Sequence, residues 1–133
     1  MFKMDIQLHD SNVQKVYDPI VTIDDVYEYI FIEGHLEIIK NKQIVLSEDI
    51  AVVEFYWYIS KWYSEGSIKQ KLEFRYNTIE HIEPILLFSY YHDKLWKISS
   101  PWLKSATDII VEEHVLESEV NRLICYLEKE LEL

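Results

Sequence analysis

Apolar and polar residues alternate strictly at the start of the chain. In residues 2–8, FKMDIQL, every second side chain is apolar and those between are polar. A period of two is typical of a strand with one buried and one wetted face. Residues 27–32 are mostly β-branched or aromatic, and residues 36–39 and 43–46 flank the sequence KNK at 40–42. The first third of the chain is therefore predicted to be β-rich, with a tight hairpin turn at KNK.

A second β-rich region follows residue 66. Apolar and polar side chains alternate through residues 71–76, and residues 85–91 and 95–99 flank the sequence HDK at 92–94. This arrangement predicts a second hairpin. Residues 107–111 are predicted to add one more strand. The chain as a whole is expected to form six or seven strands, mostly antiparallel.

Between these regions, residues 49–65 contain the aromatic stretch EFYWYISKWY, which we predict to be helical. At 100° per residue one broad face is apolar and charged residues gather opposite it. Ser47 or Asp49 is predicted to cap the start of the helix, and Gly66 to follow its end. The β propensity of FYWYI favours a strand instead, but residues 54–61 alternate poorly. The predicted apolar face consists of Ala51, Val52, Phe55, Tyr58, Ile59, Trp62 and Tyr63.

Three apolar residues of this predicted helix fall outside its main face. Ile50, Val53 and Trp57 form a narrower stripe beside Glu54. Either another part of the chain covers this stripe, or it is a partner or dimer surface anchored by Trp57, since tryptophan is enriched at binding hot spots. The residues predicted for partner binding are Trp57, Val53, Ile50 and Glu54.

The C-terminal residues predict a second amphipathic helix. Ser118 is predicted to cap its start, and Cys125 lies opposite its apolar stripe, so we expect this thiol to be exposed or in a contact. The stripe consists of Leu116, Val120, Leu123, Ile124, Leu127 and Leu131. The predicted fold class is α+β, with a mostly antiparallel sheet of six to seven strands that carries two helices on one face.

The length and charge of the chain narrow the classes of function. A chain of 133 residues suffices for one core, so residues 1–133 are predicted to form a single domain. The formal net charge is -11, from 24 acidic against 13 basic residues. Such a surface disfavours nucleic acid and anionic membranes, and favours solubility or steering toward a basic partner. The start of the chain does not resemble a signal peptide, so a cytoplasmic location is expected.

The sequence contains none of the common catalytic motifs. GxSxG, GxGxxG and GxxxxGK[ST] do not occur, and the chain has two glycines in total. His81 lies between Glu80 and Glu83. These residues are either solvated side chains at the edge of a sheet or, as the alternative, a weak binding site for a divalent metal ion. Cys125 is predicted within a helix rather than at a helix start, where a thiolate would be favoured. We therefore expect a protein that is not an enzyme and uses no metal and no cofactor.

The layout as a whole resembles a known group of proteins. The N-terminal strand, the two hairpins, the aromatic helix EFYWYISKWY, the segment SYYHDKLWKISSPW and the final helix, on an acidic chain, resemble the small immunity proteins of bacterial polymorphic toxin systems and neighbouring bacterial families. The resemblance transfers no individual residues. It implies a cytoplasmic, non-enzymatic protein that binds and inhibits a toxin domain, often a basic nuclease. The alternatives are a scaffolding or homodimeric protein with no toxin partner, and a small-ligand-binding domain.

Overall fold

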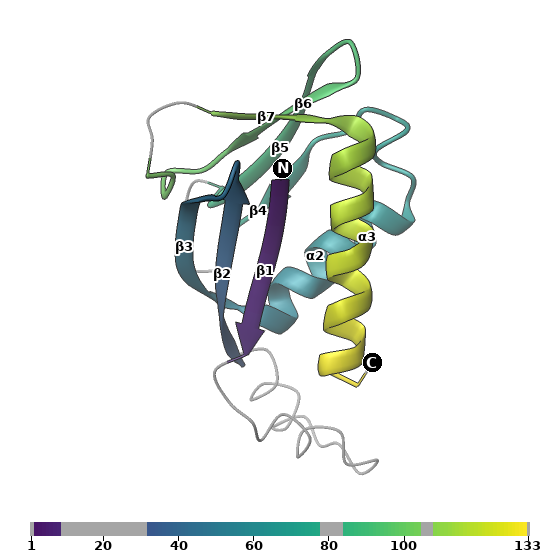
Figure 1. Ribbon diagram of the computed structural model, residues 1–133. Helices are drawn as coiled ribbons and strands as arrows, with labels where there is room; N and C mark the ends of the chain where they lie inside the picture. The colour runs from purple at the N-terminus through teal and green to yellow at the C-terminus, as the bar shows by residue number, and fades with distance from the viewer. Residues whose placement is uncertain (1, 9–31, 78–83, 105–107, 133) are drawn as a thin grey trace.

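The computed structural model describes residues 2–8, 32–77, 84–104 and 108–132. Within these ranges the chain forms seven strands and two helices (Figure 1). The strands are β1 (Phe2–Leu8), β2 (Glu33–Lys40), β3 (Gln43–Ala51), β4 (Phe74–Tyr76), β5 (Leu86–His92), β6 (Leu95–Ser99) and β7 (Ile109–Glu112). The helices are α2 (Val52–Ser64) and α3 (Glu113–Glu130). Most of the strand predicted at 27–32 lies outside the described residues, as do Glu80, His81 and Glu83.

The fold class is α+β, as predicted, and each strand pair is antiparallel. The strands form two separate sheets, ordered β1-β2-β3 and β4-β5-β6-β7, so the prediction of a single sheet was wrong. α2 follows β3 directly and carries the chain away from the first sheet before β4 begins. Both sheets turn their apolar sides toward one buried cluster. An alternating pattern therefore looks the same whether the strands belong to one sheet or to two.

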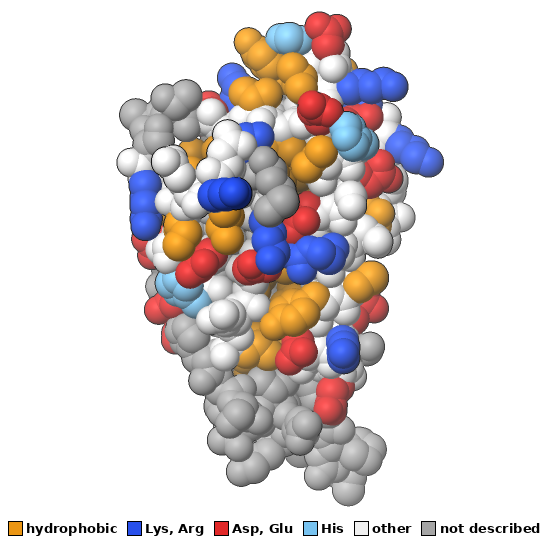
Figure 2. Space-filling model, viewed as in Figure 1, with side chains coloured by type: hydrophobic (Ala, Val, Ile, Leu, Met, Phe, Trp, Pro, Cys, Tyr) orange, Lys and Arg blue, Asp and Glu red, His pale blue; other side chains and the backbone are white. Residues whose placement is uncertain are grey.

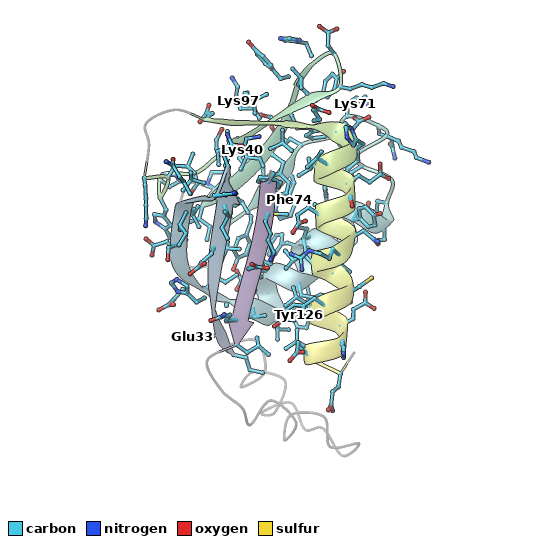
Figure 3. All side chains as sticks on the ribbon, in the orientation of Figure 1. Glu33, Lys40, Lys71, Phe74, Lys97 and Tyr126 are labelled. Carbon is cyan, nitrogen blue, oxygen red and sulfur yellow. The ribbon has the colours of Figure 1, made fainter. Side chains whose placement is uncertain are left out.

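The helices also bridge the two sheets instead of lying on one face of a single sheet. α2 packs against β3 and β4, and α3 packs against β1, β6 and β7. In Figure 1, α3 runs beside β1 with its first turn at the end of β7, and α2 crosses behind it. Two hydrogen bonds also join the first sheet directly to β7 and to the segment that precedes it. Lys40 Nζ, at the end of β2 (Figure 3), donates to the carbonyl oxygen of Ile110 at 3.2 Å, and the N–H of Lys104 donates to that of Val45 at 2.8 Å.

Both predicted hairpins are present. Each turns through two residues with positive φ, which are Asn41 and Lys42 in the first hairpin and Asp93 and Lys94 in the second. Two consecutive left-handed residues match the twist of the flanking strands, and asparagine and aspartate tolerate this conformation well. Each turn is one residue shorter than predicted, because Lys40 and His92 still belong to strands.

The predicted end of α2 is confirmed, but its start is not. Gly66 follows the helix with φ +73°, and its N–H donates to the carbonyl oxygen of Tyr63 while that of Ser67 donates to Trp62. This pair of bonds is the Schellman arrangement. Ser47 and Asp49 do not cap the helix, because β3 continues to Ala51 and keeps both residues in the sheet.

α3 likewise begins earlier than predicted. It starts at Glu113, directly after β7, so Ser118 lies inside the helix and is not its N-cap. The predicted apolar stripe is confirmed, since all six of its residues are buried. Cys125 is exposed, as expected.

One glycine is required where the first sheet meets α2. A Cβ atom on Gly34 would lie 2.4 Å from Cγ2 of Val52 and 2.9 Å from the carbonyl oxygen of Gln7. The buried side chains of α2 can approach β2 this closely only because the position has no side chain.

Candidate functional site on helix α2

The structure separates the four residues predicted for partner binding. Ile50 and Val53 are buried in the core, so the prediction that they present a surface was wrong. The error follows from the helix start: Ile50 belongs to β3, where alternate side chains face the core, and Val53 lies in the first turn of the helix beneath the surface. Trp57 is 46% exposed, and Glu54 is half-buried.

A second large aromatic side chain is exposed beside Trp57. Tyr58 was predicted for the buried face, yet it is 45% exposed. Its ring rests edge-on against the buried ring of Tyr76, with centroids 5.6 Å apart. β4 therefore supports Tyr58 from below and leaves its outer side free. Two adjacent exposed aromatic side chains are characteristic of binding surfaces in water-soluble domains.

A groove of about 530 Å³ separates α2 from α3. Trp57 lines it, so the exposed indole also borders a concave surface. We call this feature the interhelical groove. Its lining consists of Tyr56, Trp57, Ser60, Lys61, Tyr63 and Ser64 from α2 and Asn121, Ile124, Cys125 and Glu128 from α3.

The negative charges of two glutamates on α3 act on tyrosines that line the interhelical groove. Burial raises the pKa of Tyr56, and the negative charge of Glu128 raises it further. Burial and Glu117 act in the same way on the pKa of Tyr63. Glu128, toward the end of α3, thus acts on the first half of α2, and Glu117, toward the start of α3, acts on the second half. The lining of the groove offers hydroxyl donors, one carboxylate, that of Glu128, and one basic residue, Lys61.

The carboxylate of Glu54 lies in an unusual environment at the start of α2. Its Oε1 atom is buried and has no hydrogen-bond partner. Burial raises the pKa of this carboxyl above its ordinary value of 4.5. The charge of Glu54 in turn contributes, after burial, to raising the pKa of Tyr76, which places the carboxylate close to that phenol. The Tyr76 hydroxyl does not satisfy it, because it donates to the carbonyl oxygen of Ala51 at 3.4 Å.

A chain of polar side chains on the β2–β3 hairpin escaped the sequence analysis. His35 Nδ1 lies 2.8 Å from Asp49 Oδ1, and His35 Nε2 lies 2.6 Å from Ser47 Oγ. The order matches a serine–histidine–aspartate chain, but the Asp49 side chain is 59% exposed. In serine hydrolases this carboxylate is buried and holds the imidazole in one tautomer, whereas water competes for an exposed one. The network therefore links the polar face of the hairpin across its strands.

Among the described residues, the histidine in the sequence EEHVLE is a surface group. His114 is exposed, and its Nδ1 lies 3.5 Å from Oε2 of Glu112. Within the described ranges, no three histidine, cysteine, aspartate or glutamate side chains gather as metal ligands would. In the same part of the chain, no helix combines the length and apolar character needed to cross a bilayer.

Comparison with known proteins places the chain in a family. A family model described as a domain of unknown function, DUF7878, matches residues 4–133. The chain belongs to the DUF7878 family. No curated protein and no solved structure matches it. The match to DUF7878 spans both sheets, both helices and the interhelical groove, so the candidate site lies within the family domain.

Proposed function

We propose that this DUF7878 protein is a non-enzymatic protein-binding module whose interhelical groove receives a basic segment of a partner protein. The observation that carries the proposal is the exposure of Trp57, 46%, on a groove lined by both helices. A tryptophan left half in water gains apolar burial when a partner covers it. The groove is open, so a partner surface fits it better than a small molecule that must be enclosed on most sides.

The charge of the molecule favours a basic occupant. The chain carries a net charge of -11, Glu128 lines the groove, and the charge of Glu117 acts on Tyr63. On the face shown in Figure 2, acidic and basic side chains are mixed with apolar patches, so the acidic excess is not one block there. Charge therefore guides a basic partner toward the protein, and the aromatic groove supplies the specific contact.

Within this function, we propose that the partner is a basic toxin domain that the protein inhibits in the cytoplasm of a bacterium. The support is the resemblance in layout and charge to immunity proteins of polymorphic toxin systems. An inhibitor of this kind needs no catalytic group, only a surface complementary to the toxin domain. A second copy of the same chain is a less suitable occupant, because two surfaces with the same acidic excess repel each other.

Site-directed photocrosslinking tests the proposal. A photoreactive phenylalanine analogue replaces Trp57 in the full chain, the crosslinked protein is identified by mass spectrometry, and that protein is then purified. Its affinity is measured for the wild type, Trp57→Ala and the control Tyr91→Ala. Tyr91 is 51% exposed in β5, so the control removes a comparable exposed aromatic side chain away from the groove.

The expected result is binding by the wild type, at least about 30-fold weaker binding by Trp57→Ala and unchanged binding by Tyr91→Ala. Association with the partner should also slow markedly between low and physiological salt. Equal affinities for the wild type and Trp57→Ala would refute the groove as the binding site. Sedimentation of the protein without its partner tests for a homodimer. A homodimer that Trp57→Ala abolishes would mean that a second copy of the chain, and not a different protein, occupies the groove.

A further inference from the structure

Glu54 differs from the other buried polar groups around the α2 core. The indole N–H of Trp62 donates to the carbonyl oxygen of Leu72 at 3.0 Å, and the indole N–H of Trp96 donates to Glu113 at 3.1 Å. Within the described residues, Oε1 of Glu54 is the buried side-chain atom left without such a partner. An unsatisfied buried carboxylate oxygen is costly and calls for an explanation. Oε1 itself has no surface that another molecule can reach, but the Glu54 side chain as a whole is only half-buried.

The exposed aromatic side chains lie on the same side of α2 as this carboxylate. Trp57 follows Glu54 by three residues and Tyr58 follows it by four, and positions separated by three or four residues are neighbours on a helix surface. Both rings are about half exposed. The ring of Tyr58 is held in place by its edge-on contact with Tyr76.

Among the described residues, no basic side chain forms an ion pair with Glu54. The nearest lysine on the same side of α2 is Lys61, which follows Glu54 by seven residues, or about 10 Å along the helix axis. The ion pairs between described residues involve other glutamates, such as Glu113 with Lys71. Glu54 therefore carries a negative charge without an ion-pair partner in the described part of the chain, and the exposed part of its side chain is open to a cation that comes from another molecule.

We propose that Glu54, Trp57 and Tyr58 form a binding site for an arginine side chain of the partner. The proposal rests on the protein-binding function proposed above and adds the chemistry that the partner must supply. A guanidinium group is planar, weakly hydrated and rich in N–H donors. It can stack on the indole or phenol ring while it donates to the carboxylate. A lysine ammonium satisfies the charge but lacks the planar face, so it binds more weakly.

A small probe tests the site without the partner. Nα-acetyl-arginine methylamide is titrated into the full chain while the indole N–H signal of Trp57 is followed by NMR. The matched probes are the lysine amide, which keeps the charge, and the citrulline amide, which keeps the shape but is uncharged. We expect saturable binding of the arginine amide, with at least about tenfold weaker binding of citrulline and an intermediate value for lysine.

Variants assign the interaction to named side chains. Glu54→Gln keeps the shape of the side chain and removes its charge. It should weaken binding of the arginine amide at least about tenfold. Glu65→Gln, at the exposed end of the same helix, should leave the affinity for the arginine amide unchanged. Tyr58→Ala removes an exposed ring, so it tests the site in a folded protein even if Glu54→Gln is unstable. Equal affinities of the arginine and citrulline amides, or no effect of Tyr58→Ala and Glu54→Gln, would overturn the proposal.

The same variants separate this inference from the proposed function. Suppose that Trp57→Ala weakens binding of the purified partner while Glu54→Gln binds it as tightly as the wild type does. The groove then binds a partner, and the proposal of an arginine site is wrong. If the arginine amide binds through Glu54 but Trp57→Ala does not affect the partner, the arginine site stands and the proposed groove function fails.

Discussion

Trp57 and Trp62 are five residues apart on α2, yet they occupy opposite environments. Trp62 is 8% exposed, and its ring lies within 6 Å, centroid to centroid, of Phe74, Phe88 and Trp96. Trp57 is 46% exposed and borders the interhelical groove. Five residues turn a helix by 140° from its starting direction, so the two indoles cannot serve the same surface.

Truncation of the two tryptophans should therefore have different effects on stability. Trp62→Ala should lower the free energy of unfolding by about 3 to 5 kcal/mol, because it leaves a cavity among aromatic rings and removes the donor to Leu72. Trp57→Ala should change it by less than about 1 kcal/mol. Denaturant melts of the two variants measure the difference. Similar large losses would mean that Trp57 is a core residue in solution.

A second prediction concerns the exposed edge of β1. The N–H of Met4 donates to Glu119 Oε1 at 3.1 Å, and its carbonyl oxygen accepts from Arg122 Nη2 at 2.5 Å. The two side chains of α3 thus take the place of a neighbouring strand. Arg122→Ala should lower the free energy of unfolding by about 1 to 3 kcal/mol, since a charged donor is lost from a part-buried acceptor.

The control for this variant is Ser118→Ala on the same helix. Ser118 is exposed and lies inside α3, so its loss should change stability by less than about 0.5 kcal/mol. Arg122→Ala should also increase concentration-dependent aggregation, because the uncovered strand edge can pair with another chain. Equal melting midpoints for both variants would show that the contact to Met4 contributes nothing to the fold.

The features that the sequence predicts well depend on neighbouring residues. Asn41 and Asp93 mark two-residue turns because they tolerate positive φ, and the strands on each side follow from the turns. The stripe of α3 is equally local, since a period of 3.6 residues identifies the buried side of a helix without knowledge of its neighbours.

The features that the sequence misses depend on contacts between distant segments. The start of α2 moves from the predicted cap to Val52 because Ala51 pairs with Glu33 across the sheet, an interaction that overrides local capping preference. The pairing of His35 with Asp49 requires a bulge in β3, because uninterrupted pairing from the turn would place His35 opposite Glu48. The burial of Oε1 of Glu54 depends on how α2 packs within the fold, which no periodicity describes.

The half-buried Glu54, whose Oε1 atom is buried, leads to a third prediction, on pH and stability. Its pKa is raised in the folded protein, so the folded state binds this proton more tightly than the unfolded state does. The carboxylate therefore destabilises the free protein above its folded pKa, and this effect disappears as the pH falls below the ordinary value of 4.5. Glu54→Gln should melt at a higher temperature than the wild type at pH 7, with a difference that shrinks toward pH 4.

Calorimetry of both proteins between pH 4 and 7 checks this expectation, and other acidic groups cancel because both proteins share them. A higher stability combined with weaker binding is typical of a residue kept for function rather than for folding. A lower melting temperature for Glu54→Gln at pH 7 would indicate that the charged carboxylate stabilises α2, as an acid in the first turn of a helix can.

The last prediction uses Cys125 as a reporter of the interhelical groove. Its thiol is exposed, lines the groove and is the single cysteine of the chain, so alkylation modifies one known position. A partner segment in the groove covers this thiol. Saturation with the partner should slow alkylation of Cys125 by iodoacetamide at least about tenfold, as measured by intact mass against time.

The control carries Tyr91→Cys in a Cys125→Ser background, which moves the reporter to an exposed position in β5. Alkylation there should continue at the rate of the free protein. Protection at position 91 but not at Cys125 would place the partner on the second sheet and exclude the groove.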